Sequence, residues 1–368
     1  NSINLGTALT GALNQGITGI RCASSNPVCI ITNNTIANLN NAAVSSGSTT
    51  YARGIVMATS PSNITGNTIR NLTTACINAG TTTSAALQGI TNPSSNATVA
   101  QTISNNTIHT LVNTNTTNGV SVIGIIANWS STATTLTCSK NLIHSLRSSG
   151  IASCNIFGIY IGAGAATYSN NMIRLGLDET GNSLTVAQNI AGINEALGTN
   201  TIVHNSVYIG GTGVAAGTNN SYAFWAQQTT NARVFRNNIF VNDRQNGAGT
   251  GLNLAAQYAG TFTNSIPATG LTLNNNIYFA RTTANTIRQG TTAYTLASWR
   301  NFSGCDALSG VASDTTDINF INARGAAGDL NLHVQGTTVA EGAGFTLAAI
   351  TDDFDGQTRS GLTPVDIG

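Results

Sequence analysis

The four residues Asn33-Asn34-Thr35-Ile36 recur along the chain, and this repetition predicts the fold. Asparagine occupies the second position of eight copies, and a large apolar residue occupies the fourth. The eight asparagines are Asn34, Asn67, Asn106, Asn141, Asn171, Asn205, Asn238 and Asn276. They are separated by 33, 39, 35, 30, 34, 33 and 38 residues. A period in this range is typical of solenoids and other stacked repeats.

A second marker, the dipeptide Gly-Ile, keeps the same period. It begins at Gly54, Gly89, Gly124, Gly158 and Gly192, at intervals of 35, 35, 34 and 34 residues. We interpret each unit as an apolar strand opened by Gly-Ile, a polar stretch, a strand around Asn-x-Ile and a variable loop. Alternating β-branched residues punctuated by Gly and Asn favour short strands and tight turns over helices.

These patterns predict an all-β protein, a right-handed parallel β-helix solenoid of about eight coils. We expect repeats of about 34 residues over 1–280 and terminating coils with an irregular C-terminal cap over 281–368. Residues 1–32 are expected to form an incomplete first coil, on which upstream sequence or another subunit stacks. The repeated asparagines are expected at a bend, where asparagine tolerates left-handed backbone. Their stacked amides are expected to hydrogen-bond along the axis as a ladder.

The amino-acid composition limits the classes of binding partner that we expect. Charged residues make up 7 % of the chain and the net charge is +1, so neither nucleic acid nor an anionic membrane surface is an expected partner. The chain contains no run of 18 apolar residues, so we expect no membrane insertion. The single lysine and the abundance of Asn and Thr favour an extracellular or outer-surface location, with signal and sorting segments removed.

The six cysteines show no CxxC spacing and no nearby histidine cluster, which argues against zinc and redox motifs. Cys22 and Cys29 bracket a short loop and are the predicted disulfide. Cys138 and Cys154 are a second candidate disulfide, which the sequence indicates less strongly. The alternative is that most of the cysteines are small buried apolar residues.

The position that follows the core apolar residue holds a row of basic side chains in four successive units: Arg70, His109, His144 and Arg174. The functional interpretation is a shallow polar surface strip that binds a glycan or another anionic surface. The simpler interpretation is that an outward position accepts any residue. We favour the simpler one, because neither histidine has a carboxylate partner in the sequence pattern.

Catalytic patterns are sparse in the repeats. A glycosidase needs two carboxylates, and a calcium-assisted lyase needs several. The units before Asn237 supply only Asp178, Glu179 and Glu195, and we find no aromatic platform with paired carboxylates. The sequence therefore favours a protein without catalytic activity.

After Tyr278 the period ends and a different pattern begins. Trp299 and Phe302 lie near Gly304 and Asp306, Asp329-Leu330-Asn331-Leu332 follows, and the chain closes with Asp353-Phe354-Asp355-Gly356-Gln357-Thr358-Arg359 and Asp366-Ile367-Gly368. This closing pattern resembles the end of secreted right-handed parallel β-helix repeat proteins of Bacteroidota and related bacteria. The resemblance implies an extracellular or cell-surface protein and does not imply a reaction.

In this closing segment we expect Arg359 to pair with Asp355 or Asp366 as part of the cap. Calcium at Asp352, Asp353 and Asp355 is disfavoured, because the pattern lacks a distal Glu, so we expect neither a metal nor a cofactor. The predicted function is an extracellular structural protein: a cell-surface stalk, fibre subunit or adhesin region. Its expected partners are copies of itself end to end or a surface glycan. The alternative is a β-helix protein that binds or cleaves polysaccharide.

Overall fold

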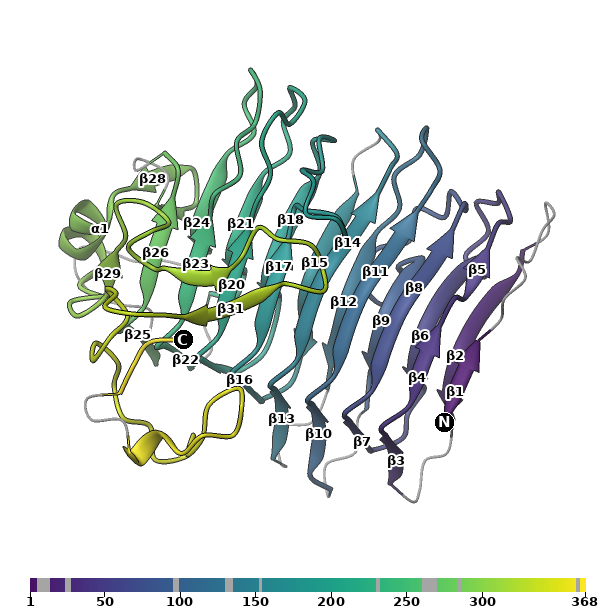
Figure 1. The fold of residues 1–368 in the computed structure, drawn as a ribbon, viewed down its shortest axis with the longest axis horizontal. Helices are drawn as coiled ribbons and strands as arrows, with labels where there is room; N and C mark the ends of the chain where they lie inside the picture. Colours follow the sequence, from purple (N-terminus) through teal and green to yellow (C-terminus); the bar gives the residue numbers. More distant parts are fainter. Residues whose placement is uncertain are drawn as a thin grey trace.

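The computed structural model describes residues 1–4, 14–23, 28–94, 99–129, 135–151, 154–229, 232–259, 270–282, 286–361 and 365–368. These residues form a parallel β-solenoid of about eight turns, which confirms the predicted fold class (Figure 1). The coils are built from three sheets, A, B and C, and successive coils add parallel strands to each sheet. No helix among the described residues has the length and apolar character needed to span a bilayer.

Sheet A contains the strands that follow the repeated asparagines. They are β1 (Ser2–Asn4), β4 (Thr35–Ala37), β5 (Asn40–Asn41), β8 (Thr68–Thr74), β11 (Thr107–Asn113), β14 (Leu142–Ser148), β17 (Met172–Leu175), β20 (Ser206–Ile209), β23 (Ile239–Asn242), β26 (Ile277–Ala280) and β29 (Gly310–Val311). The apolar column predicted for this sheet is confirmed, because all eight members are fully buried. They are Ile36, Ile69, Ile108, Ile143, Ile173, Val207, Phe240 and Tyr278.

Sheet B contains the strands with the Gly-Ile marker. They are β2 (Gly16–Cys22), β6 (Tyr51–Met57), β9 (Leu87–Asn92), β12 (Val122–Asn128), β15 (Asn155–Ala163), β18 (Asn189–Glu195), β21 (Ser221–Ala226), β24 (Asn253–Tyr258), β27 (Ile287–Gln289) and the antiparallel β28 (Thr292–Tyr294). The marker lies inside these strands and does not open them. A Cβ built on Gly54 would lie 2.7 Å from Ile69 Cγ2 and 2.5 Å from Gly89 O. Glycine is therefore needed where sheet B closes on the isoleucine column.

Sheet C falls in the stretch that was interpreted as polar, so the sequence analysis missed it. Its strands are β3 (Cys29–Thr32), β7 (Ser62–Thr65), β10 (Gln101–Ser104), β13 (Leu136–Ser139), β16 (Thr167–Ser169), β19 (Thr201–Val203), β22 (Arg233–Arg236) and β25 (Leu271–Asn274). In every strand the residue three before the repeated asparagine is buried. The series is Ile31, Ile64, Ile103, Cys138, Tyr168, Ile202, Phe235 and Leu273. This constant spacing was the available signal.

The asparagine ladder runs through the corner between sheets C and A. Asn106 Nδ2 donates to Asn141 Oδ1 at 2.9 Å, and Asn141 Nδ2 donates to Asn171 Oδ1 at 2.9 Å. The same bond links every consecutive pair from Asn34 to Asn276. Each ladder carbonyl also accepts the backbone N–H of the preceding ladder residue, as Asn141 Oδ1 does from Asn106 N at 3.1 Å.

The left-handed backbone predicted for the ladder asparagines lies one residue earlier. The residues with positive φ are Asn33, Gly66, Asn105, Lys140, Asn170, His204, Asn237 and Asn275. This residue turns the chain at the corner, so the next side chain points inward and meets its neighbours. Lysine and histidine occupy the turn in two coils, although such residues adopt this conformation less readily than Gly or Asn.

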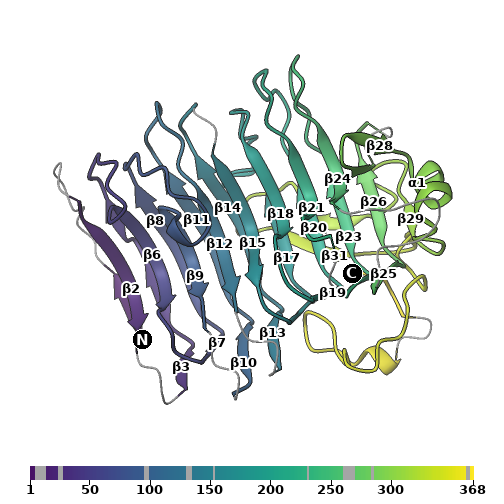
Figure 2. The same cartoon turned by 180° about the vertical axis from the view of Figure 1, so that it is seen from behind.

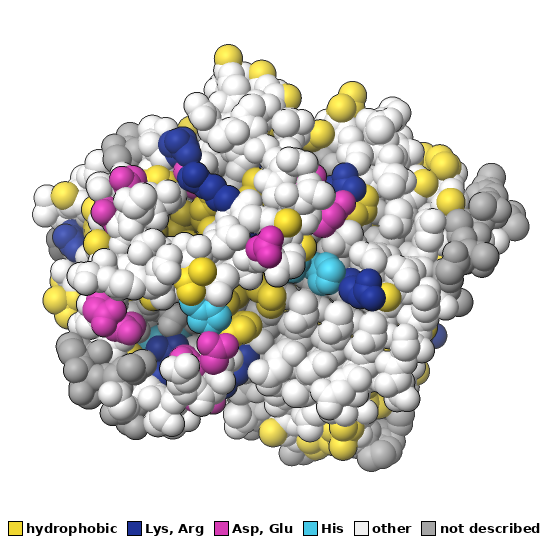
Figure 3. Space-filling view, viewed as in Figure 1, with side chains coloured by type: hydrophobic (Ala, Val, Ile, Leu, Met, Phe, Trp, Pro, Cys, Tyr) yellow, Lys and Arg dark blue, Asp and Glu magenta, His cyan; other side chains and the backbone are white. Residues whose placement is uncertain are grey.

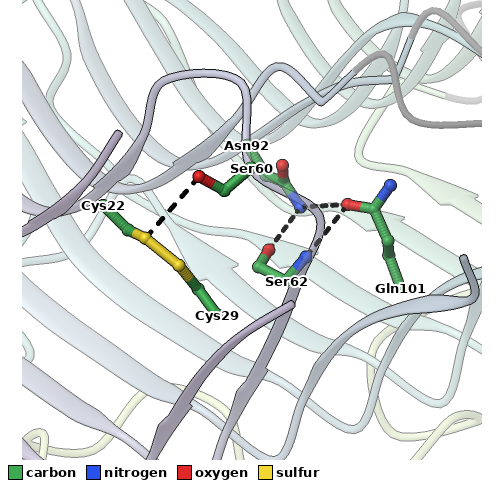
Figure 4. The surroundings of a disulfide bond; sticks show 6 residues. All are labelled: Cys22, Cys29, Ser60, Ser62, Asn92 and Gln101. Atoms are coloured by element: carbon green, nitrogen blue, oxygen red, sulfur yellow. Dashed lines mark hydrogen bonds between the residues drawn. A yellow bond between two sulfur atoms is a disulfide. The ribbon is translucent and has the colours of Figure 1, made fainter. Parts of the chain in front are cut away.

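The first coil is more complete than predicted. β1, β2 and β3 each pair in parallel with the second coil and form the edge strand of their sheet. The rest of the segment, residues 5–13 and 24–27, lies outside the described residues. Cys22 and Cys29 form the predicted disulfide, and Cys22 Sγ lies 3.6 Å from Ser60 Oγ (Figure 4). Nearby, Asn92 Nδ2 donates to Ser62 Oγ at 3.0 Å.

The pairing of Cys138 with Cys154 is wrong, because both thiols are free and buried, as are those of Cys76 and Cys305. Cys138 points inward from sheet C within the apolar column, and burial raises the pKa of its thiol. Burial likewise raises the pKa of Cys154 to about 12. These four cysteines are therefore small buried residues, as the alternative interpretation of the sequence held.

The segment predicted as one cap divides into two parts. Helix α1 (Leu296–Ser303) covers the end of the core, where Trp299 stacks on Tyr258 at a centroid distance of 5.6 Å. From β29 onward the chain turns back and runs along the outer face of sheet A (Figures 1 and 2). This return segment, described over residues 310–361 and 365–368, includes the antiparallel pair β30 (Phe320–Asn322) and β31 (Asn331–Val334) and the short helix η3 (Arg359–Gly361).

We expect Asn141→Ala to lower the free energy of unfolding by about 3 kcal/mol, because the backbone N–H and side-chain amide of Asn106 and the carbonyl of Ile103, in the preceding coil, each lose a hydrogen bond. Urea denaturation of the purified protein measures the change. Asn105→Gly is the control, since Asn105 is exposed and its positive φ suits glycine. Equal stabilities for Asn141→Ala and the wild type would show that the ladder contributes nothing.

Candidate functional site

The four basic residues predicted as a surface strip do lie in one row on sheet A. Arg70, His109 and His144 are paired across β8, β11 and β14, and Arg174 follows in β17. The rings of His109 and His144 stack face to face, with centroids 4.8 Å apart and planes inclined by 4°. The period of the repeat therefore placed these side chains correctly relative to one another.

The row is not an open strip, because the return segment covers its C-terminal half. Arg174 is fully buried and donates to the carbonyl oxygens of Gly325 and Asp178 and to Ser145 Oγ. His144 is 2 % exposed. Only Arg70 and His109 remain half-buried at the edge of the return segment. A continuous four-residue glycan strip is thus not present.

Burial also removes charge from this row. It lowers the pKa of His144 to about 3, with smaller contributions from His109 and Arg174. The pKa of His109 is lowered by burial and by Arg70, while Glu179 opposes the shift. Both imidazoles are therefore neutral at neutral pH and separate two guanidinium groups.

The return segment is held on sheet A by an apolar contact. Outward side chains of β17, β20, β23 and β26 pack against residues of the segment in one buried cluster. The sheet contributes Met172, Tyr208, Ile239, Val241, Ile277 and Phe279, and the segment contributes Ala312, Ile318, Ala323, Leu332, Ala340 and Ile367. These sheet residues are large and apolar. In the first coils the same two positions carry threonine in one row and Ala37, Arg70 and His109 in the other, which explains why the segment covers only the later part of the sheet.

Ion pairs lock the segment in place. Asp243, 3 % exposed, accepts from Tyr208 Oη at 2.8 Å and pairs with Arg281 and Arg324. Hydrogen bonds to Tyr208 and Asp243 help raise the pKa of Arg324. At the other end of the segment, Lys140 pairs with Asp352 at 2.6 Å. The only lysine of the chain therefore joins the fourth unit to residues more than two hundred positions later.

The residues of the closing motif have different hydrogen-bond and ion-pair partners from those predicted. Among the described residues, Arg359 forms no ion pair with Asp355 or Asp366. It donates instead to Asn170 Oδ1 and Gly368 O, both at 2.9 Å. Asp355 pairs with His333 at 2.8 Å, and Asp366 accepts from Gly342 N at 2.7 Å. The return of the chain onto sheet A brought Asn170 to Arg359, a contact that sequence distance concealed.

The three aspartates considered for calcium are separately engaged. Asp352 pairs with Lys140, Asp355 with His333, and Asp353 Oδ1 accepts from Gln357 N at 2.7 Å. The described residues contain no group of three His, Cys, Asp or Glu side chains arranged to hold a metal ion. These carboxylates hold the loop 352–359 in shape.

A cavity of about 280 Å³ lies between sheet A and this loop. Its lining includes Met172 and Ile239 from the sheet, Phe354 from the loop, and the buried His204 and Arg359. Figure 3 shows acidic, basic and histidine side chains gathered where the return segment crosses the sheet. Burial lowers the pKa of His204 to about 3, so this ring is neutral. The cavity can accept a small polar group, but its Asp and Arg side chains are engaged in holding the fold.

Two buried carboxylates were not singled out as sites by the sequence analysis. Glu195 pairs with Arg233 at 2.8 Å in the core, and burial raises its pKa to about 7, opposed by Arg233 and Asn200. Asp306 accepts from Trp299 Nε1 at 2.9 Å and from Ser309 Oγ at the end of the ladder. The signal for Glu195 was its rarity, since it is an acidic residue within a strand of an almost uncharged stretch. Asp306 lies in a loop of the acid-rich C-terminal segment and carried no such signal.

Sheet B carries an outward aromatic group that was also missed. Phe157 and Tyr160 lie on β15, and Tyr222 and Trp225 lie on β21. Phe157 and Tyr222 belong to one buried cluster, with Tyr160 and Trp225 packed against it. The signal was two aromatic pairs with the same three-residue spacing, placed two units apart around the Gly-Ile position.

Comparisons with protein-family models, with curated proteins and with solved structures found no match for the chain. The features that bear on function are therefore those of the fold: the clamped return segment, the cavity beneath it and the aromatic face of sheet B. Most of the charges around the first two serve to hold the structure together.

We expect Asp243→Ala to release the return segment, because it leaves Arg281, Arg324 and Tyr208 Oη without their shared acceptor. Limited proteolysis with mass spectrometry should show cleavage after residue 310 at least about fivefold faster than in the wild type, as expected for a loss of more than about 1 kcal/mol. Asp329→Ala, an exposed residue of the same segment, is the control. Unchanged cleavage in Asp243→Ala would show that the apolar contact alone holds the segment.

The buried histidines predict a pH dependence of stability. His144 and His204 have folded pKa values of about 3, below the ordinary value of about 6.5, so the unfolded state binds more protons between these limits. Their contribution is complete above pH 6.5 and declines as the pH falls toward 3. Glu195, with its raised pKa, acts in the opposite direction between about 4.5 and 7.

Comparison with a His144→Gln/His204→Gln double variant separates the two effects, since both proteins keep Glu195. Urea denaturation at pH 7 and pH 5 should show that the wild type loses more stability on acidification than the variant. An equal loss in the two proteins would mean that these histidines do not titrate with depressed pKa values.

Proposed function

We propose that this chain is a non-catalytic structural region of a secreted bacterial β-helix protein, displayed outside the cell as a stalk or adhesin region. The observation that carries the proposal is the uninterrupted ladder from Asn34 to Asn276, which hydrogen-bonds each coil to the next along the whole axis. Such a body resists bending and separation of its coils, which suits a spacer or a display scaffold.

The contacts of the buried charged side chains support the same proposal. The large buried cations Arg174 and Arg244 donate to backbone carbonyls, and the buried acids Glu195, Asp243 and Asp306 are held by hydrogen bonds or ion pairs. These groups serve the stability of the fold, whereas an active site usually keeps some ionisable groups free for substrate.

The two ends of the solenoid differ. α1 and β28 cover the C-terminal end of the core, while β1, β2 and β3 are the edge strands of the described sheets at the other end. Growth of a filament by stacking copies head to tail needs two open ends. The covered end therefore favours a stalk or adhesin region over a fibre subunit that elongates by stacking.

Imaging provides the test. Negative-stain electron microscopy with light scattering at rising concentration should show short single rods, or pairs joined at the N-terminal edges. Immunogold labelling of intact cells that produce the protein should place it outside the cell. Filaments with a regular axial repeat would overturn the stalk in favour of a fibre subunit, and exclusively cytoplasmic label would overturn the surface location.

A further inference from the structure

The outer face of sheet B presents a straight row of aromatic and amide side chains across four consecutive coils. The row consists of Tyr160, Asn194, Trp225 and Gln257, which are paired from strand to strand through β15, β18, β21 and β24. We call these four residues the sheet B platform. None of the four carries a formal charge at neutral pH, and Arg288 continues the row on β27.

The two aromatic members are held by rings beneath or beside them. Trp225 stacks on Tyr222 with centroids 4.8 Å apart and packs edge-on against Phe157. Tyr160 stacks on Phe157 at 6.1 Å. Phe157 and Tyr222 are 3 % and 4 % exposed, whereas Tyr160 and Trp225 remain half-buried. The platform rings are therefore pre-organised on a rigid sheet, which reduces the entropy lost on binding.

The amides between and beside these rings have unused hydrogen-bonding capacity. Asn194 is 1 % exposed; its Oδ1 accepts from Gln227 Nε2 at 2.8 Å, but within the described part of the chain its Nδ2 has no partner. Gln257 Oε1 is buried and equally without a partner there. A buried unpaired polar atom costs about 1–3 kcal/mol, and a ligand that pairs with it recovers part of that cost. One free donor and one free acceptor thus flank Trp225.

We propose that the sheet B platform binds an extended, neutral polysaccharide along the solenoid axis. The C–H faces of pyranose rings pack on aromatic side chains, and sugar hydroxyls both donate to and accept from amides, which is the chemistry this row supplies. Coils are about 4.8 Å apart, a spacing comparable with the rise of one pyranose unit in an extended chain. Tyr160 and Trp225 are half-buried and lie two coils apart, so they would contact alternate sugars.

Other occupants fit the platform less well. A hydrocarbon or apolar peptide would leave Asn194 Nδ2 and Gln257 Oε1 unpaired. An acidic polymer would find a cation only at the Arg288 end of the row. The proposal holds whether or not the solenoid serves as a stalk, since it depends only on this face of sheet B.

Intrinsic fluorescence offers a direct readout. Of the three tryptophans, Trp129 and Trp299 are fully buried, and Trp225 alone is half-buried on the surface. Titration with soluble glucomannan, xyloglucan and a β-1,3-glucan should shift the emission and protect it from acrylamide quenching for at least one of them. Polygalacturonate serves as the acidic probe. Isothermal titration calorimetry gives the affinity.

Trp225→Ala should weaken binding by about tenfold or more, as expected for an aromatic anchor, and Trp225→Phe should retain most of it. The matched control is Arg70→Ala/His109→Ala, which alters the remaining exposed part of the sheet A row and should leave binding unchanged. Thermal unfolding of each variant establishes that it is folded, and Asn194→Ala provides a second platform variant with the rings intact.

Three results would overturn the proposal. They are binding of none of the neutral polysaccharides by the wild type, unchanged affinity in folded Trp225→Ala and Asn194→Ala, and binding of polygalacturonate alone. Loss of binding in Arg70→Ala/His109→Ala with the platform variants unaffected would assign the glycan to sheet A. None of these outcomes bears on the rod shape or location proposed above, so the two proposals fail independently.

Discussion

The hydrogen bond between the side-chain amides of successive coils is the interaction on which the rest of this structure depends. Each ladder asparagine satisfies a backbone N–H in the preceding coil and donates both to the next amide and to a buried carbonyl, so the corner between sheets C and A contains few unpaired groups. Because the corner is fixed in every coil, the residues on all three sheets remain in register along the axis. Rows of side chains, whether buried or exposed, are a direct consequence.

That register explains the core as well as the surfaces. The isoleucine column of sheet A meets the glycines of sheet B at distances that leave no room for a Cβ, so the two sheets approach closely. Where Phe240 and Tyr278 enlarge the column toward the C-terminal end, sheet B supplies Ala223 and Ala255 in place of glycine, and aromatic rings fill the wider interior. The side chains that fill the interior therefore change from mainly aliphatic to aromatic along the axis, while the backbone path stays the same.

The return segment gives the two halves of sheet A different properties. Over the first coils the sheet exposes threonine, arginine and histidine, and over the later coils it presents an apolar surface that residues 310–368 cover. Covering it removes a hydrophobic patch that would otherwise promote association. Sheet B differs, because its outward rings Tyr160 and Trp225 pack on buried rings and remain half-buried. The proposed binding surface therefore lies on a different sheet from the return segment.

The sequence by itself determined the period, the parallel β-helix, the inward column of sheet A, the ladder positions and the Cys22–Cys29 disulfide, because each depends on contacts between residues one unit or less apart. It also placed Arg70, His109, His144 and Arg174 in one row for the same reason. Sheet C was missed because its strands are only three or four residues long and most include Ser, Thr or Asn, so each resembles a polar loop when read alone. Only the tertiary structure decided the path of residues 310–368, the partners of Arg359 and Asp243, and the burial of Arg174 and His144. These depend on contacts between segments up to 212 residues apart, whose choice rests on the shape of a surface that exists only after the coils have stacked.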